Sequence, residues 1–450
     1  MGELIFLCVA TVSLGFAFRA IRRDQGQRVS VRAISSVIYL VCLWVPAHLQ
    51  ASGAITSKLY KAGLTSAPTL DEIDRLCLQW AIELGVIALA EALIWAWRSK
   101  EAATTPKVAA LINPRGTATL LIIIGALATI LLQVPGLDER AAGGQGIPTL
   151  LRTSLLCGLA VIVYYRGFND WKYKTVVAIG ILWLFTQNIR SPLFVLFFAY
   201  IASELVHRRF SSKKRLTITV LIIIILAFGG ALMSSLRANV VRDTGLSTQQ
   251  VISQTFEDPL TAPFESGLDT LDGYRFSERL LPIVEPRPWD ILNVVTTFVP
   301  RAIWPDKPSD LSVELSTSYL GYKGSGQYLS PAGYLSLVTG TWLGAVVGLA
   351  LFTMLFAVLL RRFRSHFWSA LILCTVFRFF LGGSSFDLYY GLTLVVPVLA
   401  VQTWLRSTWT PPPEIPVGAE AAGSTRRRTL TGPSQMSVVG ASDAEGRSVF

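Results

Sequence analysis

The stretch Phe298-Val-Pro-Arg-Ala-Ile-Trp-Pro-Asp-Lys-Pro308 closes a polar block that begins near residue 236 in an otherwise apolar chain. Its prolines prevent a continuous helix, because proline lacks a backbone N–H and fixes φ. Between the prolines lie an arginine, a tryptophan, an aspartate and a lysine. These residues predict a rigid extended turn that presents cations beside an aromatic ring near a membrane surface. The same residue types also serve as interfacial anchors, and that alternative stays open.

The composition around this block is typical of a membrane protein. Of the 450 residues, 52% are hydrophobic and only 15% are charged, with a mean hydropathy of +0.50. A soluble chain carries about 25% charged residues. The net charge of +11 does not indicate nucleic-acid binding, because the basic residues fall mostly in short loops on one side of the predicted membrane. We therefore predict a polytopic membrane protein of the all-α class.

Apolar runs recur along the chain, and most have the length of about 17–25 residues that crosses a bilayer. They predict eleven spans, at about 3–19, 33–52, 76–97, 117–135, 147–165, 174–187, 190–206, 216–235, 332–360, 367–382 and 387–405. Spans one to eight occupy 1–235, and spans nine to eleven occupy 332–405. Between them, 236–331 is predicted to form an extracytoplasmic loop domain, and the Pro/Gly/Ser-rich tail at 406–450 is predicted to be disordered.

The basic residues orient these spans. Lysines and arginines gather after spans one, three, five, seven and nine and in the tail, which the positive-inside rule places in the cytoplasm. We therefore expect a multi-pass protein of the cytoplasmic membrane, with its N-terminus outside and its C-terminus in the cytoplasm. The 236–331 block then lies outside, and its mixed charge does not contradict this, because long loops translocate regardless of charge.

Two parts of the outer block are expected to be helical. In Glu265–Val284, leucines and aromatics recur at about a helical spacing, while Glu265, Asp269 and Asp272 share another face. Pro288–Phe298 has the pattern of a short apolar helix that lies in the membrane interface and leads into the proline-rich turn. These patterns predict a mostly helical loop domain above the bundle.

Two arginines are predicted at membrane depth. Arg190 lies in the tight turn between spans six and seven, and Arg378 lies within span ten. A charge at that depth is costly unless it faces a wet cavity or a partner. Arg190 therefore either faces such a cavity or extends to the outer surface. Arg378 either faces a cavity or pairs with a carboxylate such as Asp387.

Several kinds of site are excluded because their motifs are absent. The chain has no Walker A motif, no GxGxxG before a helix, no HExxH and no CxxC pair, so we expect no nucleotide pocket, no zinc site and no cofactor. Only His48 of the three histidines is predicted near the outer surface, which disfavours a histidine base in the loop. The acidic residues of Asp71–Asp74 resemble the acidic pair of lipid-phosphate-sugar transferases, but they also suit the start of a helix. All five cysteines lie in apolar segments and predict no disulfide framework.

The remaining external groups are arginines and a few carboxylates. Arginine suits phosphate because it is permanently charged and binds in a bidentate manner. At the outer face of a membrane, the phosphates to be bound belong to lipid head groups or to polyprenyl-diphosphate carriers. A diphosphate leaves readily when cations stabilise its charge, and a carboxylate can take the proton of the acceptor hydroxyl.

The Phe298–Pro308 stretch resembles the P-R-x-I-W-P-x-K-P sequence that closes the large outer loop of O-antigen and oligosaccharide repeat-unit polymerases (Wzy type). Two further features are similar. An Arg-Ser pair at Arg190 begins the span that ends in Arg208-Arg209, and the Gly-rich segment 331–344 leads into the span after the loop. The resemblance covers about 188–345, whereas the first five spans agree only in hydropathy.

This resemblance implies a GT-C-like bundle and a membrane glycosyltransferase. Such an enzyme polymerises undecaprenyl-diphosphate-linked oligosaccharide repeat units into surface polysaccharide at the outer face of the cytoplasmic membrane. Its partners are this lipid-linked oligosaccharide and membrane lipid, with a chain-length regulator and a flippase as candidate protein partners and no nucleic acid. Related O-antigen ligases carry a histidine in the corresponding loop, and its absence here favours a polymerase.

The resemblance also implies roles for particular residues. Glu265 and Asp269 are the candidate catalytic bases, although both also fit solvated carboxylates on a helix. Trp304 either stacks on a sugar face or anchors the chain in the interface. The candidates for diphosphate binding are Arg190, Arg237, Arg242, Arg301 and Lys307.

Two other loop arginines, Arg275 and Arg279, are expected to form ion pairs within the loop, with Asp272 and Glu278 as partners. Two rival functions remain open. A flippase or transporter of lipid-linked sugars often shows inverted repeats, and the chain has no internal repeat. A scaffolding membrane subunit would leave the external arginines tolerant of alanine.

Overall fold

The computed structural model describes residues 1–23, 30–56, 59, 66–97, 111–131, 146–165, 171–186, 191–206, 217, 220–221, 224, 228–229, 231–232, 235–236, 247–257, 261, 264, 270–299, 303–321, 328–363 and 365–408. All regular structure in this part of the chain is helical. The chain divides into two units, Met1–Leu405 and Arg406–Phe450. The boundary between them lies where the predicted tail begins. Residues 409–450 of that tail, including its predicted disorder, lie outside the described residues.

Six helical stretches in the described part are long and apolar enough to cross a membrane. The first is a continuous stretch of α2 (Val31–Ile38), the π-helix η1 (Tyr39–Trp44) and α3 (Val45–Ala51). The others are α5 (Leu70–Trp97), α6 (Pro114–Leu131), α8 (Gly146–Tyr165), α18 (Trp342–Arg362) and α20 (Ser385–Thr408). A helix satisfies its own backbone hydrogen bonds, as the apolar interior of a membrane requires. The chain is a multi-pass helical membrane protein.

Shorter apolar stretches lie within α1 (Gly2–Arg23), α10 (Ser191–Val206) and α19 (His366–Gly382), and α9 (Trp171–Thr186) follows the same pattern. These helices coincide with predicted spans one, seven, ten and six. Predicted span eight is described only at scattered positions. The eleven-span topology and the GT-C-like arrangement therefore stay predictions.

The apolar side chains form two cores. The first joins α1, α2, α5, α18 and α19 with helices of the 236–331 block, through buried residues such as Trp80, Tyr274 and Leu315. The second joins α6, α8, α10, α19 and α20. Within it α6 and α8 pack closely, because a Cβ on Gly125 would lie 2.2 Å from the backbone nitrogen of Leu155. Helix α19 contributes to both cores.

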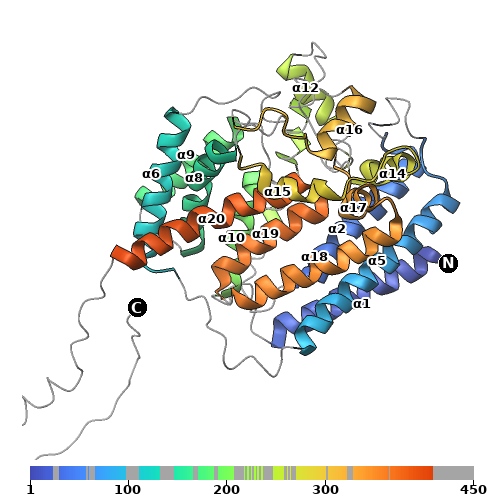
Figure 1. Ribbon diagram of the computed structural model, residues 1–450, viewed down its shortest axis with the longest axis horizontal. Coiled ribbons are helices and arrows are strands. Elements are labelled where there is room, and N and C mark those ends of the chain that lie inside the picture. Colours follow the sequence, from blue (N-terminus) through green and yellow to red (C-terminus); the bar gives the residue numbers. More distant parts are fainter. Residues whose placement is uncertain are drawn as a thin grey trace, which may run out of the picture. The chain divides into compact units, whose positions relative to one another are not determined.

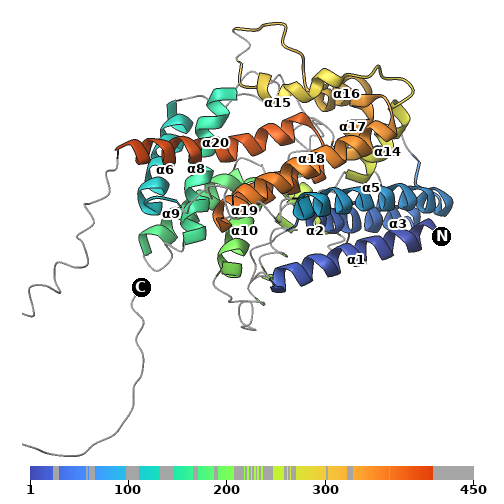
Figure 2. The same ribbon diagram turned by 60° about the horizontal axis from the view of Figure 1, so that its bottom comes forward.

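The described part of the 236–331 block consists of short helices and turns. In order they are α12 (Thr248–Thr255), α14 (Thr270–Leu280), the 3-10 helix η4 (Pro288–Leu292), α15 (Asn293–Thr296) and α16 (Leu311–Leu320). Helix α17 (Pro331–Thr339) follows directly after the block. Figures 1 and 2 show α14, α15, α16 and α17 gathered on one side of the spanning helices. The helical part predicted for Glu265–Val284 is seen as α14, with Glu265 and Asp269 outside the described residues.

The predicted span 332–360 is interrupted, which corrects the sequence-based prediction. Helix α17 ends at Gly340, whose φ of +76° is a left-handed conformation that side chains other than glycine rarely adopt. Thr341 then caps α18, its hydroxyl accepting a hydrogen bond of 3.0 Å from the Gly344 N–H. Hydropathy stays high through this break, so the apolar pattern alone did not locate it.

The segment Pro288–Phe298 forms the two short helices η4 and α15, close to its predicted helical state. Its large apolar side chains are exposed to a degree unusual for a loop. Trp289 is 77% exposed and Val295 is 65% exposed, and Ile303 in the following turn is 75% exposed. We name Trp289, Leu292, Val295 and Ile303 the apolar rim, and their exposure fits the predicted place of this segment at a membrane interface.

Candidate functional site

The described residues of Phe298–Pro308, the proline-rich turn, form no helix, as the prolines predict. At its start, the ring of Phe298 lies 5.0 Å from the ring of Tyr389 in α20. Lys307 is 3% exposed, and its Nζ donates to the Val299 carbonyl at 3.3 Å. The ammonium therefore lies against the backbone of the turn instead of facing outward as the sequence suggested. Trp304 is 40% exposed.

The turn lies between two aspartates that we name the acid pair, Asp290 and Asp310. Asp290 lies in η4, and Asp310 caps α16 by accepting from the Ser312 N–H at 2.9 Å. The Ser385 hydroxyl, at the first residue of α20, lies 2.5 Å from Asp310 Oδ2 and 3.4 Å from Asp290 Oδ2. Three segments far apart in sequence thus meet at one hydroxyl group.

Asp290 is the more buried member of the acid pair. Its Oδ2 accepts from the Tyr334 hydroxyl at 2.6 Å, and its Oδ1 accepts from Asn293 Nδ2 at 2.9 Å and from the Leu311 N–H at 3.1 Å. Burial, followed by the charge of Asp310, raises the pKa of the Asp290 carboxyl to about 7. Asp310 is only partly buried. Asp290 can therefore gain or lose a proton near neutral pH, and Asp310 is the more accessible member of the pair.

Arg378 pairs with Asp387, a carboxylate two residues after Ser385. Its Nε is 2.8 Å from Asp387 Oδ1, and its guanidinium carbon lies 4.5 Å from the ring centre of Tyr390. The Ser384 hydroxyl and N–H both donate to Asp387, at 3.0 and 3.1 Å. The pairing of Arg378 with Asp387, one of the two alternatives from the sequence, is confirmed. A buried charge is satisfied here by an ion pair and an aromatic ring.

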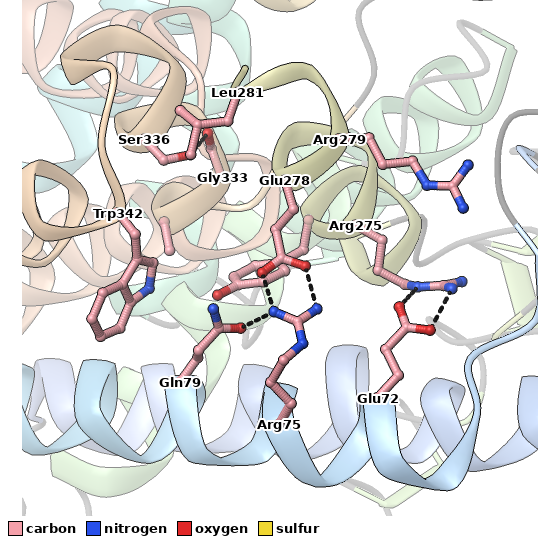
Figure 3. Close-up of a pocket in the computed structure, with 12 residues that line it drawn as sticks. Glu72, Arg75, Gln79, Arg275, Glu278, Arg279, Leu281, Gly333, Ser336 and Trp342 are labelled. Carbon is pink, nitrogen blue, oxygen red and sulfur yellow. Dashed lines mark hydrogen bonds and ion pairs between the residues drawn. The ribbon is translucent and has the colours of Figure 1, made fainter. Parts of the chain in front are cut away.

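A second polar feature is a cavity of about 380 Å³ that we name the α14 pocket (Figure 3). It lies between the beginning of α5, helix α14, helix α17 and the beginning of α18. Its lining residues are Glu72, Arg75, Gln79, Tyr274, Arg275, Glu278, Arg279, Leu281, Ala332, Gly333, Ser336 and Trp342.

Two bidentate ion pairs tie α14 to α5 in this pocket, as Figure 3 shows. Arg75 donates to both oxygens of Glu278 at 3.1 and 3.0 Å. Arg275 donates to both oxygens of Glu72 at 2.9 and 3.1 Å, and to the Ser66 carbonyl at 2.6 Å. The expected pairing of Arg275 within the loop is therefore wrong, because its partners are Glu72 of α5 and Ser66 just before that helix.

Asp272 and the acidic residues at the start of α5 also have partners that differ from those expected. Asp272, the expected partner of Arg275, instead accepts from Gln50 Nε2 at 2.8 Å. Arg279 lines the α14 pocket, and Figure 3 shows its side chain beside Arg275. The acidic start of α5 thus has a specific role, since Glu72 binds an arginine of the loop and Asp74 accepts from the amino group of Met1 at 2.8 Å.

Beneath the α14 pocket lies a fully buried carboxylate, Glu83 of α5. Its Oε1 accepts from the Tyr274 hydroxyl at 2.9 Å and from Trp342 Nε1 at 3.0 Å. Its Oε2 accepts from the Tyr39 hydroxyl at 2.8 Å. Tyr39 begins the π-helix η1, and such π-helical segments are frequent at functional sites. Glu83 therefore joins three spanning stretches to the loop helix α14.

Six of the site residues named from the sequence lie outside the described residues: Arg190, Arg237, Arg242, Glu265, Asp269 and Arg301. Their proposed roles in catalysis and diphosphate binding therefore stay predictions. Sequence reasoning missed the acid pair and Glu83. Glu83 could have been found from the sequence, because a carboxylate within an apolar span must find partners. Asp310 could also have been found, because Ser-Asp before an apolar run is typical of a helix N-cap.

Among the described residues, no group of His, Cys, Asp and Glu side chains is arranged to hold a metal ion. No protein-family model, no curated protein and no solved structure matches the chain.

Proposed function

We propose that this protein is a membrane glycosyltransferase that polymerises polyprenyl-diphosphate-linked oligosaccharide repeat units. The observation that carries the proposal is the position of the acid pair. The proline-rich turn, whose sequence resembles that of repeat-unit polymerases, lies against α20 through Phe298 and Tyr389. It leads directly to Asp310, which meets Asp290 at the Ser385 hydroxyl.

The acid pair supplies the group that such a transfer needs. A hydroxyl of the incoming lipid-linked unit attacks the anomeric carbon of the growing chain. The bond from that carbon to the diphosphate oxygen breaks, the diphosphate leaves, and the proton of the hydroxyl passes to a carboxylate. Asp310 is the accessible acceptor, and the Ser385 hydroxyl links it to Asp290 behind it. In this proposal the pair takes precedence over Glu265 and Asp269 as the base.

Cations must stabilise the charge of the leaving diphosphate. Arg301 in the proline-rich turn is the first candidate, followed by Arg190, Arg237 and Arg242, with Lys307 holding the turn in place through the Val299 carbonyl. In this proposal the 236–331 block and the acid pair face the outer side of a cytoplasmic membrane. The substrate is an undecaprenyl-diphosphate-linked oligosaccharide, and the protein partners are a chain-length regulator and a flippase.

Complementation of a deletion strain tests the proposal, with surface polysaccharide resolved by size. We expect single repeat units in the deletion strain and a ladder of chain lengths with the wild-type gene. Asp310→Asn and Arg301→Ala should each leave single units although the protein is present in the membrane. Asp306→Asn is the matched control, because Asp306 is an exposed carboxylate of the same turn.

Two results would contradict the proposal. A normal ladder with both Asp310→Asn and Arg301→Ala would exclude the acid pair and the turn from the site. A deletion strain that lacks external repeat units and accumulates lipid-linked units inside would identify a flippase instead.

A further inference from the structure

We propose that the α14 pocket is a binding site for an uncharged sugar ring of the oligosaccharide substrate. The identity of the oligosaccharide rests on the proposed function. The conclusion that the ligand is a neutral sugar rests on the residues that line the pocket. Neither Asp290 nor Asp310 lines the pocket, which is formed by α5, α14, α17 and the first residue of α18.

The charges of the pocket favour a neutral ligand over a diphosphate. Two of the three lining arginines, Arg75 and Arg275, are each neutralised by a bidentate carboxylate, Glu278 and Glu72. A diphosphate would have to compete with both carboxylates for these guanidinium groups. A sugar needs no such exchange, because its hydroxyls can donate to the outer lone pairs of the carboxylates and accept from the remaining N–H groups.

The walls of the pocket add the second property that a sugar requires. Trp342 and Gln79 both line the cavity (Figure 3), and Trp342 is partly exposed. An indole ring offers a flat apolar face to the C–H groups of a pyranose, while polar groups around it read the hydroxyls. The Gln79 amide and the Ser336 hydroxyl supply such polar groups. The cavity of about 380 Å³ falls within the usual range of small-molecule sites, about 300–1,000 Å³.

Glu83 is the positioning residue of this site. It does not line the cavity, but its Oε1 accepts from both Trp342 Nε1 and the Tyr274 hydroxyl, which do. Two aromatic side chains of the wall are therefore fixed by one buried oxygen atom. A preorganised aromatic wall binds a ligand without losing side-chain freedom at the moment of binding.

The test uses the full-length protein in lipid nanodiscs. The probe is the free repeat-unit oligosaccharide, released by mild acid from the lipid carrier that accumulates in the deletion strain. We expect binding by calorimetry or saturation-transfer NMR, and loss of about tenfold or more in affinity for Trp342→Ala. Trp342→Phe keeps a flat ring but loses the N–H, so it should retain more affinity than Trp342→Ala. Trp289→Ala is the control, because Trp289 is exposed on η4 and lies outside the pocket lining.

Two further variants keep the test decisive if Trp342→Ala fails to fold. Gln79→Trp fills the cavity from a partly exposed position, and it should abolish binding with an unchanged melting temperature. Glu83→Gln keeps the shape but replaces one acceptor oxygen by a donor, so it should weaken binding while substrate saturation still restores the maximal rate.

Inorganic pyrophosphate serves as the second probe. It should not bind in the pocket, and direct binding of pyrophosphate to the wild type that is lost in Gln79→Trp would overturn the proposal in favour of a diphosphate site. Unchanged affinity in both Trp342→Ala and Gln79→Trp would overturn it as well. If the complementation experiment instead identifies a flippase while these variants lose oligosaccharide binding, the sugar site stands and only the proposed reaction fails.

Discussion

The acid pair and the α14 pocket both contain two carboxylates, but the two regions differ in how the charge of these carboxylates is balanced. In the pocket, Glu72 and Glu278 each face a guanidinium group. In the acid pair, two carboxylates face each other across a serine hydroxyl, and the pKa of Asp290 rises to about 7. Balanced charges give a rigid surface suited to binding. Unbalanced charges give a group that changes its protonation near neutral pH, which suits proton transfer.

The largest effect is expected from removing the unbalanced charge. Asp310→Asn should lower the rate of polymer formation by about 10²–10⁴-fold, because the neutral amide cannot take a proton from the acceptor hydroxyl. The rate is measured with purified protein and lipid-linked repeat units. Glu72→Gln, which alters a balanced carboxylate of the proposed sugar site, should leave most of the maximal rate intact at saturating substrate, because Glu72 is proposed to bind the substrate and not to take its proton. Equal losses in both variants would remove the distinction between the two regions.

Breaking the more buried ion pair should mainly affect stability. Arg275 is 4% exposed at its side chain, so Arg275→Ala leaves Glu72 and the Ser66 carbonyl without their donor. We expect a loss of about 3 kcal/mol, seen as a lower melting temperature in nanodiscs. A double variant, Arg275→Ala with Glu72→Ala, should recover part of that loss, whereas no recovery would show that the pair itself contributes little.

The next largest effect is expected in how stability and reaction rate depend on pH, which should differ between the two regions. Burial and the charge of Asp310 raise the pKa of Asp290 to about 7. In the folded protein Asp290 therefore keeps its proton up to a higher pH than in the unfolded chain. The stability from this proton is fully present below about pH 4 and is lost as the pH rises through about 7. In the proposed reaction the acid pair takes the proton only while Asp290 is deprotonated, so the rate has the opposite trend and should fall as the pH drops through about 7.

Rates and melting temperatures measured between about pH 5 and 9 check this prediction. Asp290→Asn should flatten both profiles, whereas Glu278→Gln in the balanced pocket should leave their shapes unchanged. A wild-type rate that does not vary with pH over this range would exclude the acid pair as the proton acceptor.

The smallest effect is expected for the exposed pair of the pocket. Arg75 and Glu278 are 52% and 26% exposed at their side chains, so solvent screens their attraction. A double-mutant cycle of Arg75→Ala and Glu278→Ala should give a coupling energy of about 0.5 kcal/mol in melting experiments. A value several times larger would mean that this pair, like the one at Arg275, fixes α14 to α5.

Sequence patterns predicted features that depend on local composition. Long apolar runs located the spanning helices, and the cost of an intramembrane charge led from Arg378 to Asp387. The break at Gly340 was missed, because a hydropathy average does not respond to the φ angle of one residue. The acid pair was missed for another reason. Asp290, Asp310 and Ser385 come from three distant segments, and only tertiary packing brings them to one hydroxyl group.

The apolar rim has a consequence for how substrate reaches the protein. Trp289 and Val295 are exposed within a few residues of Asp290, on the same pair of short helices. A rim of this kind rests where lipid chains give way to head groups, and this fixes the depth of the neighbouring carboxylates. In the proposed function the reactants are lipid-anchored, and they diffuse in the plane of the membrane with their head groups at that same depth. Their encounter with the site is then a search in two dimensions, and surface density governs it instead of concentration in solution.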